Sequence, residues 1–115
     1  MPHTLSPEIR HCIEQCTKCH DVCLHTATTH CLELGGAHTA PEHLTLMFDC
    51  AQICQTAADF MLRGSPRHRE ICSACAEICD TCAMDCERLG DMDECVAACR
   101  ACAASCHDMA SSMRR

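Results

Sequence analysis

Cysteine is the residue type in this sequence with the most obvious capacity for chemistry. The chain of 115 residues holds sixteen cysteines, and most of them follow the previous one by three or four positions. They are Cys12, Cys16, Cys19, Cys23, Cys31, Cys50, Cys54, Cys72, Cys75, Cys79, Cys82, Cys86, Cys95, Cys99, Cys102 and Cys106. Because residues at these separations share one face of an α-helix, the spacing predicts helices that each carry a stripe of thiols.

Packing, disulfide formation and metal binding are the three roles open to so many thiols. A core of small thiols would lose much of the burial free energy that larger side chains provide. Disulfides fit poorly along a helix, because residues three or four apart have Cβ atoms about 5–6 Å apart, whereas a disulfide needs about 4 Å. Two metal–sulfur bonds of about 2.3 Å span that gap. We therefore interpret the stripes as metal ligands.

The first ten residues favour the same interpretation. They are polar, include Pro2 and Pro7, and lack the apolar stretch of a secretion signal. We therefore expect a cytoplasmic protein, in which thiols stay reduced and dense cysteine indicates metal binding or redox chemistry.

The identity of the metal follows from ligand type and arrangement. Thiolates favour copper(I), zinc and iron–sulfur clusters. Zinc sites and iron–sulfur clusters take four thiolates that converge from loops or turns, whereas these cysteines are spread along helices. Copper(I) accepts two or three thiolates, so we predict multiple copper(I) ions per chain, with each Cys-x3-Cys pair able to hold one. A metallothionein-like zinc or cadmium buffer, or an iron–sulfur or redox protein, are the alternatives.

Capping residues and glycines divide the chain into the elements that must position these thiols. Helix starts are indicated by Ser6 before Pro7, by Pro66, and by the capping-box pairs Thr39/Glu42 and Asp91/Glu94. Helix ends are indicated by Gly35, Gly64 and Gly90. The predicted helices span about 7–34, 40–63, 66–89 and 92–113. Their short connections predict an all-α fold, an antiparallel up-down-up-down four-helix bundle with a cysteine-lined core, formed by residues 1–115 as one domain.

Histidines and methionines are expected at both ends of this bundle. Antiparallel packing should gather Met61, His68, His107, Met109 and Met113 at one end. The other end should gather His30, His43, Met47 and Met92. Imidazole and thioether groups would hold copper more weakly than thiolates do, so we expect copper to reach the thiols through an end. The end with His68 and His107 is the predicted point of access.

Charge and hydropathy exclude several classes of function. The formal net charge of −7 argues against nucleic acid and anionic membranes as partners. No segment approaches the roughly 20 apolar residues that span a bilayer. A ladder of near-equivalent cysteines sets no nucleophile, base or open metal position apart, so we predict that the protein is not an enzyme.

The repeated Cys-x3-Cys pairs within four predicted helices, together with the absence of a secretion signal, resemble the cytosolic copper storage proteins. The resemblance covers essentially the whole chain. It implies a four-helix bundle that stores many copper(I) ions on inward-facing cysteines and assembles as a homotetramer. A copper chaperone or a cuproenzyme would then be the partner that exchanges copper with it.

Overall fold

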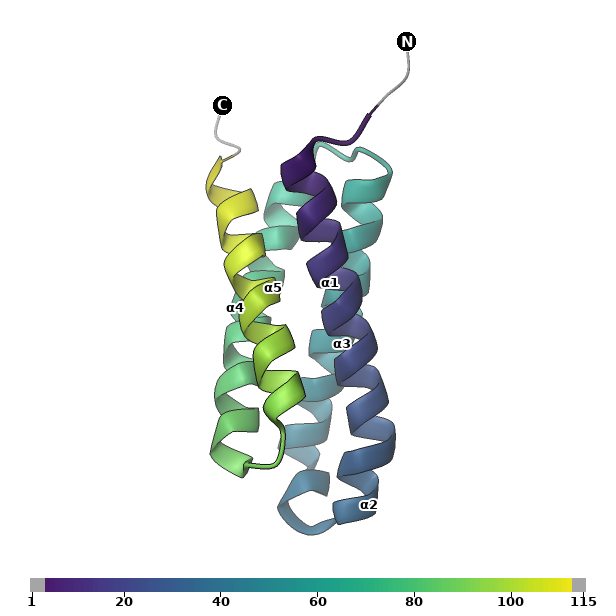
Figure 1. Ribbon diagram of the computed structural model, residues 1–115, viewed down its shortest axis with the longest axis vertical. Coiled ribbons are helices and arrows are strands. Elements are labelled where there is room, and N and C mark those ends of the chain that lie inside the picture. The colour runs from purple at the N-terminus through teal and green to yellow at the C-terminus, as the bar shows by residue number, and fades with distance from the viewer. Residues whose placement is uncertain (1–3, 113–115) are drawn as a thin grey trace.

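The computed structural model describes residues 4–112, which contain no β-strand. It confirms the predicted all-α fold, because four long helices run side by side as an antiparallel bundle (Figure 1). The elements are α1 (Pro7–Thr26), a π-helical turn (Ala27–Cys31), α2 (Leu32–Leu34), a 3₁₀ turn (Gly36–Thr39), α3 (Pro41–Leu62), α4 (His68–Leu89) and α5 (Asp93–Ser112). None of the helices in this part of the chain combines the length and apolar character needed to cross a bilayer.

Each long helix packs against two others around the bundle. α1 contacts α3 and α5, and α4 contacts the same two helices, so α1 and α4 are diagonal neighbours. The start of α1, the end of α5 and the connection between α3 and α4 lie at one end, which we name the Gly64 end (Figure 1). The opposite end holds the connections that precede α3 and α5, and we name it the Gly90 end. The rod is narrow, with extents of 53 × 22 × 19 Å.

The first helix begins where the sequence predicts. The hydroxyl of Ser6 accepts a hydrogen bond from the backbone N–H of Ile9 at 3.1 Å, and proline occupies the first turn. At the other boundaries Gly64 and Gly90 have φ values of 68° and 81°, a left-handed conformation that glycine adopts without steric cost. Both glycines therefore reverse the chain tightly enough to place consecutive helices side by side.

The two predicted capping boxes are wrong. Ala40 precedes α3 and makes no side-chain cap, while the hydroxyl of Thr39 donates to the carbonyl of Gly36 at 3.0 Å. Asp91 lies in the turn before α5 with a φ of 57°, and the helix begins two residues later. α4 likewise begins two residues after the predicted start, and the predicted last residue of the final helix, Met113, lies outside the described residues.

A π-helical turn interrupts the first helix and changes its register. Cys31 follows Cys23 by eight residues, and at about 100° per residue a regular α-helix would place Cys31 about 80° away from the thiol stripe. The turn at Ala27–Cys31 absorbs one extra residue, and Cys31 is fully buried with the other cysteines. The hydroxyls of Thr28 and Thr29 donate to the carbonyls four residues earlier, at 2.8 and 2.7 Å. The eight-residue step therefore behaves as a seven-residue step.

Within residues 4–112, no leucine, isoleucine or valine is fully buried in the core, where such side chains usually fill a bundle. Of the described residues, the buried ones are sixteen cysteines, eight alanines, four methionines and His43. Leucine, isoleucine and valine side chains flank this core and are only partly buried. Because these flanking residues bury less apolar area than a central leucine would, the fold depends less on hydrophobic burial than an ordinary bundle.

Candidate metal centre

All sixteen predicted thiol ligands point into the bundle. Each cysteine is free of disulfide bonds and is at most 1% exposed. The cysteines are buried because steps of three and four residues keep them on one face of each helix, and that face packs against the neighbouring helices. The structure therefore brings the sulfurs of four helices into one continuous interior column.

Twelve of these cysteines form five groups in which every sulfur lies within 4.8 Å of the others. From the Gly64 end toward the Gly90 end, the groups are Cys12/Cys72/Cys106, Cys16/Cys75/Cys102/Cys106, Cys54/Cys75/Cys79/Cys102, Cys19/Cys50/Cys54/Cys79 and Cys19/Cys23/Cys50/Cys99. Each group shares at least one cysteine with the next. The arrangement is therefore a chain of overlapping sites, which suits a polynuclear cluster better than separate mononuclear sites.

The closest sulfur contacts join different helices. Cys23 and Cys99 have Sγ atoms 3.5 Å apart, and Cys54 and Cys79 have theirs 3.6 Å apart. Contacts within one helix are longer, at 3.9 Å for both Cys19/Cys23 and Cys75/Cys79. Sequence spacing predicts one ion per Cys-x3-Cys pair within a helix. It does not predict the sulfur contacts between helices, because these depend on how the helices pack.

The proximity of the thiols controls their ionisation. The pKa of Cys54 is raised mainly by its contacts with other thiols, those of Cys102, Cys19 and Cys50. Burial raises it further. The pKa of Cys50 is lowered because Cys19 and Cys23 donate S–H hydrogen bonds to its thiolate. A thiolate in this core is thus stabilised by protonated neighbours, and the whole column cannot ionise without a cation to replace the protons.

The four cysteines outside the five groups all lie toward the Gly90 end. Two of them contact the predicted donor Met47, whose thioether sulfur lies 3.7 Å from Cys82 Sγ and 3.5 Å from Cys86 Sγ. Met47 is fully buried. Its sulfur therefore extends the column beyond the last group of thiols, as the sequence predicts for this end.

Cys31 and the predicted donor His43 are paired at the Gly90 end. Cys31 Sγ lies 3.4 Å from His43 Nε2 and 3.9 Å from the sulfur of Met92. His43 donates from Nδ1 to a carboxylate oxygen of Asp85 at 2.7 Å. Burial raises the pKa of the Cys31 thiol, and the charges of Cys95 and Cys82 raise it further. Cys31 therefore stays protonated, with Met92 Sδ and His43 Nε2 as the acceptors within reach of its S–H group.

The Gly64 end holds a second set of soft donors. The sulfur of Met61 lies 3.9 Å from Cys72 Sγ, and Met61 is 1% exposed. His68 donates from Nδ1 to the carbonyl of Ser65 at 2.6 Å, which leaves Nε2 as the nitrogen with the lone pair. That Nε2 atom is buried and has no hydrogen-bond partner among the described residues. A cavity of about 570 Å³ is lined in part by Met61 and His68.

The predicted donor His107 lies away from the thiol column. Its side chain is 55% exposed, and its Nε2 atom lies 2.9 Å from a carboxylate oxygen of Asp80 on the outside of α4 and α5. The position follows from the helix, because the residue after Cys106 points about 100° away from the thiol face. Antiparallel alignment predicts how far along the bundle axis a residue lies. The direction of its side chain around the helix axis must be worked out separately.

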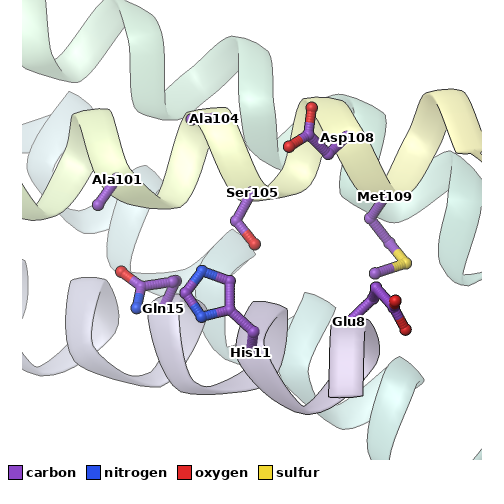
Figure 2. Close-up of a pocket in the computed structure, with 8 residues that line it drawn as sticks. All are labelled: Glu8, His11, Gln15, Ala101, Ala104, Ser105, Asp108 and Met109. Carbon is purple, nitrogen blue, oxygen red and sulfur yellow. The ribbon is translucent and has the colours of Figure 1, made fainter. Parts of the chain in front are cut away.

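The predicted donor Met109 lines a groove between α1 and α5. This groove has a volume of about 470 Å³, and Figure 2 shows Met109 at one end of it near Glu8, with Ser105 and His11 toward its middle. Met109 is 5% exposed. The small side chains Ala101 and Ala104 form the α5 wall and leave this groove open. Met109 is therefore at the predicted end of the bundle but on the side of the column.

The match to known families agrees with this site. A family model described as copper storage protein covers residues 6–111, almost the whole described chain. The chain belongs to the copper storage protein family. Copper storage proteins with solved structures share the fold: the Cu(I)-bound copper storage protein BsCsp3 is 36% identical, with a TM-score of 0.82, over 90% of this chain and 98% of that chain.

Other relatives of this copper storage protein are similarly close. The apo form of copper storage protein 3 from Bacillus subtilis is 38% identical, with a TM-score of 0.72, over 86% of this chain and 95% of that one. The protein Nmul_A1745 from Nitrosospira multiformis is 50% identical, with a TM-score of 0.90, over 91% of this chain and 96% of that one. An uncharacterized cysteine-rich protein, YhjQ of Bacillus subtilis strain 168, is 40% identical over 89 residues, which cover 77% of this chain and 81% of that protein.

Proposed function

We propose that this protein stores copper(I) by binding multiple ions along its column of thiols. The observation that carries the proposal is the chain of five overlapping sulfur groups, in which seven cysteines belong to two groups each. Shared thiolates that bridge neighbouring ions suit copper(I), which accepts two or three sulfur ligands. The Cu(I)-bound state of the related BsCsp3 supports the same cargo for this chain.

The ligands in this proposal are the fifteen cysteines other than Cys31, together with the thioethers that extend the column. Met47 continues it toward the Gly90 end through Cys82 and Cys86. Met61 continues it toward the Gly64 end through Cys72. Copper reaches the column from the Gly64 end, where Met61, His68 and Met109 offer neutral donors before the thiolates. The buried lone pair of His68 Nε2 supports this route.

The experiment that tests storage is a titration of the reduced full-length chain with copper(I) under anaerobic conditions. A coloured chelator with known copper(I) affinity competes for the metal. We expect the protein to withdraw copper until loading reaches the order of one ion per thiol. Saturation at one or two ions per chain would contradict a storage role.

A zinc buffer is the second candidate, and one observation favours it. Four of the five groups contain four thiolates, the number that a structural zinc site takes. Because those groups share cysteines, they cannot all be filled as separate tetrahedral sites. Parallel titrations with zinc and copper(I) distinguish the two functions, since a zinc buffer would keep zinc when equimolar copper(I) is added.

Residues 1–115 act in this proposal as one storage unit in the cytoplasm, without enzymatic activity. A copper chaperone or a cuproenzyme exchanges copper with it. All sixteen cysteines are buried, and buried thiols are unreactive toward substrates, which supports storage over catalysis. An iron–sulfur protein would be brown on purification, whereas copper(I) bound to thiolates is colourless.

The chain functions as a homotetramer in this proposal. Large apolar side chains remain exposed on the outside of the bundle, at Leu24, Leu32, Leu34, Phe48, Leu62 and Met84. Light scattering on the purified protein measures the mass directly. A mass equal to the 12.6 kDa of one chain would contradict the tetramer.

A further inference from the structure

Cys31 has different neighbours from every other cysteine in the core. Its sulfur contacts an imidazole nitrogen, His43 Nε2, at 3.4 Å and a thioether, Met92 Sδ, at 3.9 Å. It belongs to none of the five thiol groups. Cys31 is fully buried, Met92 is 3% exposed and His43 is 2% exposed. An imidazole and a thioether thus both contact one buried thiol at the Gly90 end, outside the five thiol groups.

A carboxylate holds the orientation of the His43 ring, on the side that faces away from Cys31. Asp85 accepts from His43 Nδ1 at 2.7 Å and from Arg88 at 2.6 Å. A carboxylate can only accept here, so the proton of a neutral His43 ring is on Nδ1 and the lone pair of Nε2 faces Cys31. In histidine metal sites, a carboxylate commonly accepts a hydrogen bond from the ring nitrogen that does not bind the metal, and so orients the ring.

The backbone of the first helix is also adjusted at this point. Without the π-helical turn at Ala27–Cys31, the Cys31 side chain would point about 80° away from the thiol face. Single π-helical turns occur frequently at functional sites. The turn therefore directs the Cys31 thiol into the core, and this observation is independent of the contact with His43.

A cavity at the Gly90 end adjoins the Met92 thioether. It has a volume of about 270 Å³, and its lining includes Met92 and Cys95. The acidic residues Asp91, Asp93 and Glu94 also line it. Their negative charge attracts a cation to this side of Met92.

We propose that Cys31, His43 and Met92 form a separate site for one copper(I) ion, positioned by Asp85. This inference rests on copper(I) storage as the function. It adds a mononuclear site with mixed nitrogen and sulfur ligands at the Gly90 end. When the ion binds, the Cys31 S–H bond breaks, a copper–sulfur bond forms and the proton passes to solvent, while copper stays in the +1 state.

The test follows His43 directly by NMR. The full-length protein is labelled with ¹⁵N-histidine, kept reduced and anaerobic, and titrated with copper(I) to saturation. We expect the Nε2 resonance of His43 to move on loading in the wild type. In Cys31→Ser and Met92→Leu that movement should be lost or strongly reduced, and total capacity should fall by about one ion per chain. Cys16→Ser, in the Gly64 half of the column, is the matched control and should leave the His43 response intact.

Two results separate this inference from the storage proposal. If the column fills with copper but His43 Nε2 is unchanged at saturation, the separate site is wrong and storage stands. If His43 responds but the protein binds only about one ion, the separate site stands and storage is wrong. A His43 response that persists unchanged in Cys31→Ser also overturns the site, because His43 would then bind copper without its thiolate.

Discussion

The sulfur atoms of Cys23 and Cys99 lie 3.5 Å apart, although 76 positions separate the two residues in the chain. This contact joins α1 to α5 and belongs to the thiol group nearest the Gly90 end. If the group holds shared copper, both residues serve the same ion.

Removing both members of this pair should therefore cost little more copper than removing one. We expect Cys23→Ser and Cys99→Ser each to lower the capacity by about one ion, and the double variant to lose less than the sum. Chelator-competition titrations of the three variants measure this. Cys23→Ser combined with Cys72→Ser, which belong to different groups, is the control and should be additive.

Copper should stabilise the fold strongly. Binding to the native state alone stabilises it by about 2.7 kcal/mol per site when free metal exceeds the dissociation constant 100-fold. With several sites filled, we expect the unfolding temperature to rise by more than about 10 °C. Thermal unfolding followed by circular dichroism, with and without copper(I), provides the measurement. An unchanged transition would mean that the ions bind outside the core.

The metal-free protein should lose stability at alkaline pH. Contacts with other thiols, together with burial, raise the pKa of Cys23, Cys54 and Cys106 in the folded state. Their contribution to stability is complete below the unfolded pKa of about 8.5 and is lost as the pH rises toward the folded pKa.

Unfolding temperatures of the reduced apo protein between pH 7 and pH 10 test this expectation. We expect a fall above about pH 8.5 that replacement of these three cysteines by alanine reduces. The copper-loaded protein is the control, since its thiolates have already lost their protons. A transition independent of pH in the apo protein would contradict the raised pKa values.

The π-helical turn should tolerate a deletion that the rest of the helix does not. Deleting Thr28 shortens the step from Cys23 to Cys31 to seven residues, so a regular α-helix would keep both thiols facing inward. We expect normal helicity and a loss of at most about one ion. Deleting Lys18 from the regular part of α1 should rotate the preceding cysteines by about 100° and remove several ions. Equal losses in the two deletions would show that the turn does not correct the register.

Replacing donors at the Gly64 end should slow copper uptake more than it lowers capacity. His68→Ala and Met61→Leu remove an imidazole and a thioether near Cys72, and we expect the initial uptake rate to fall about tenfold, from the loss of about 1.4 kcal/mol of transient binding. Stopped-flow mixing with a coloured copper(I) complex measures this rate. His107→Ala is the control and should behave as the wild type, because His107 is exposed and paired with Asp80.

The sequence predicts the bundle and its thiol face well, because the period of the cysteines and the glycines that end the helices are local features. It predicts less about the relations between helices. The contact of Cys23 with Cys99 depends on how helices rotate and align, and so does the placement of His107 on the outside of the bundle. The link from His43 to Asp85 also joins residues 42 positions apart. The eight-residue step before Cys31 was the only local signal for the π-helical turn.

The overlap between neighbouring sulfur groups has a consequence for how the protein empties. A thiolate released by a departing ion still has a neighbouring ion within bonding reach, so partial depletion leaves few buried thiolates without a counter-charge. Release can then proceed in small steps, each of similar difficulty, and the fold persists at intermediate occupancy. We therefore expect copper to leave such a bundle one ion at a time, without unfolding of the whole core.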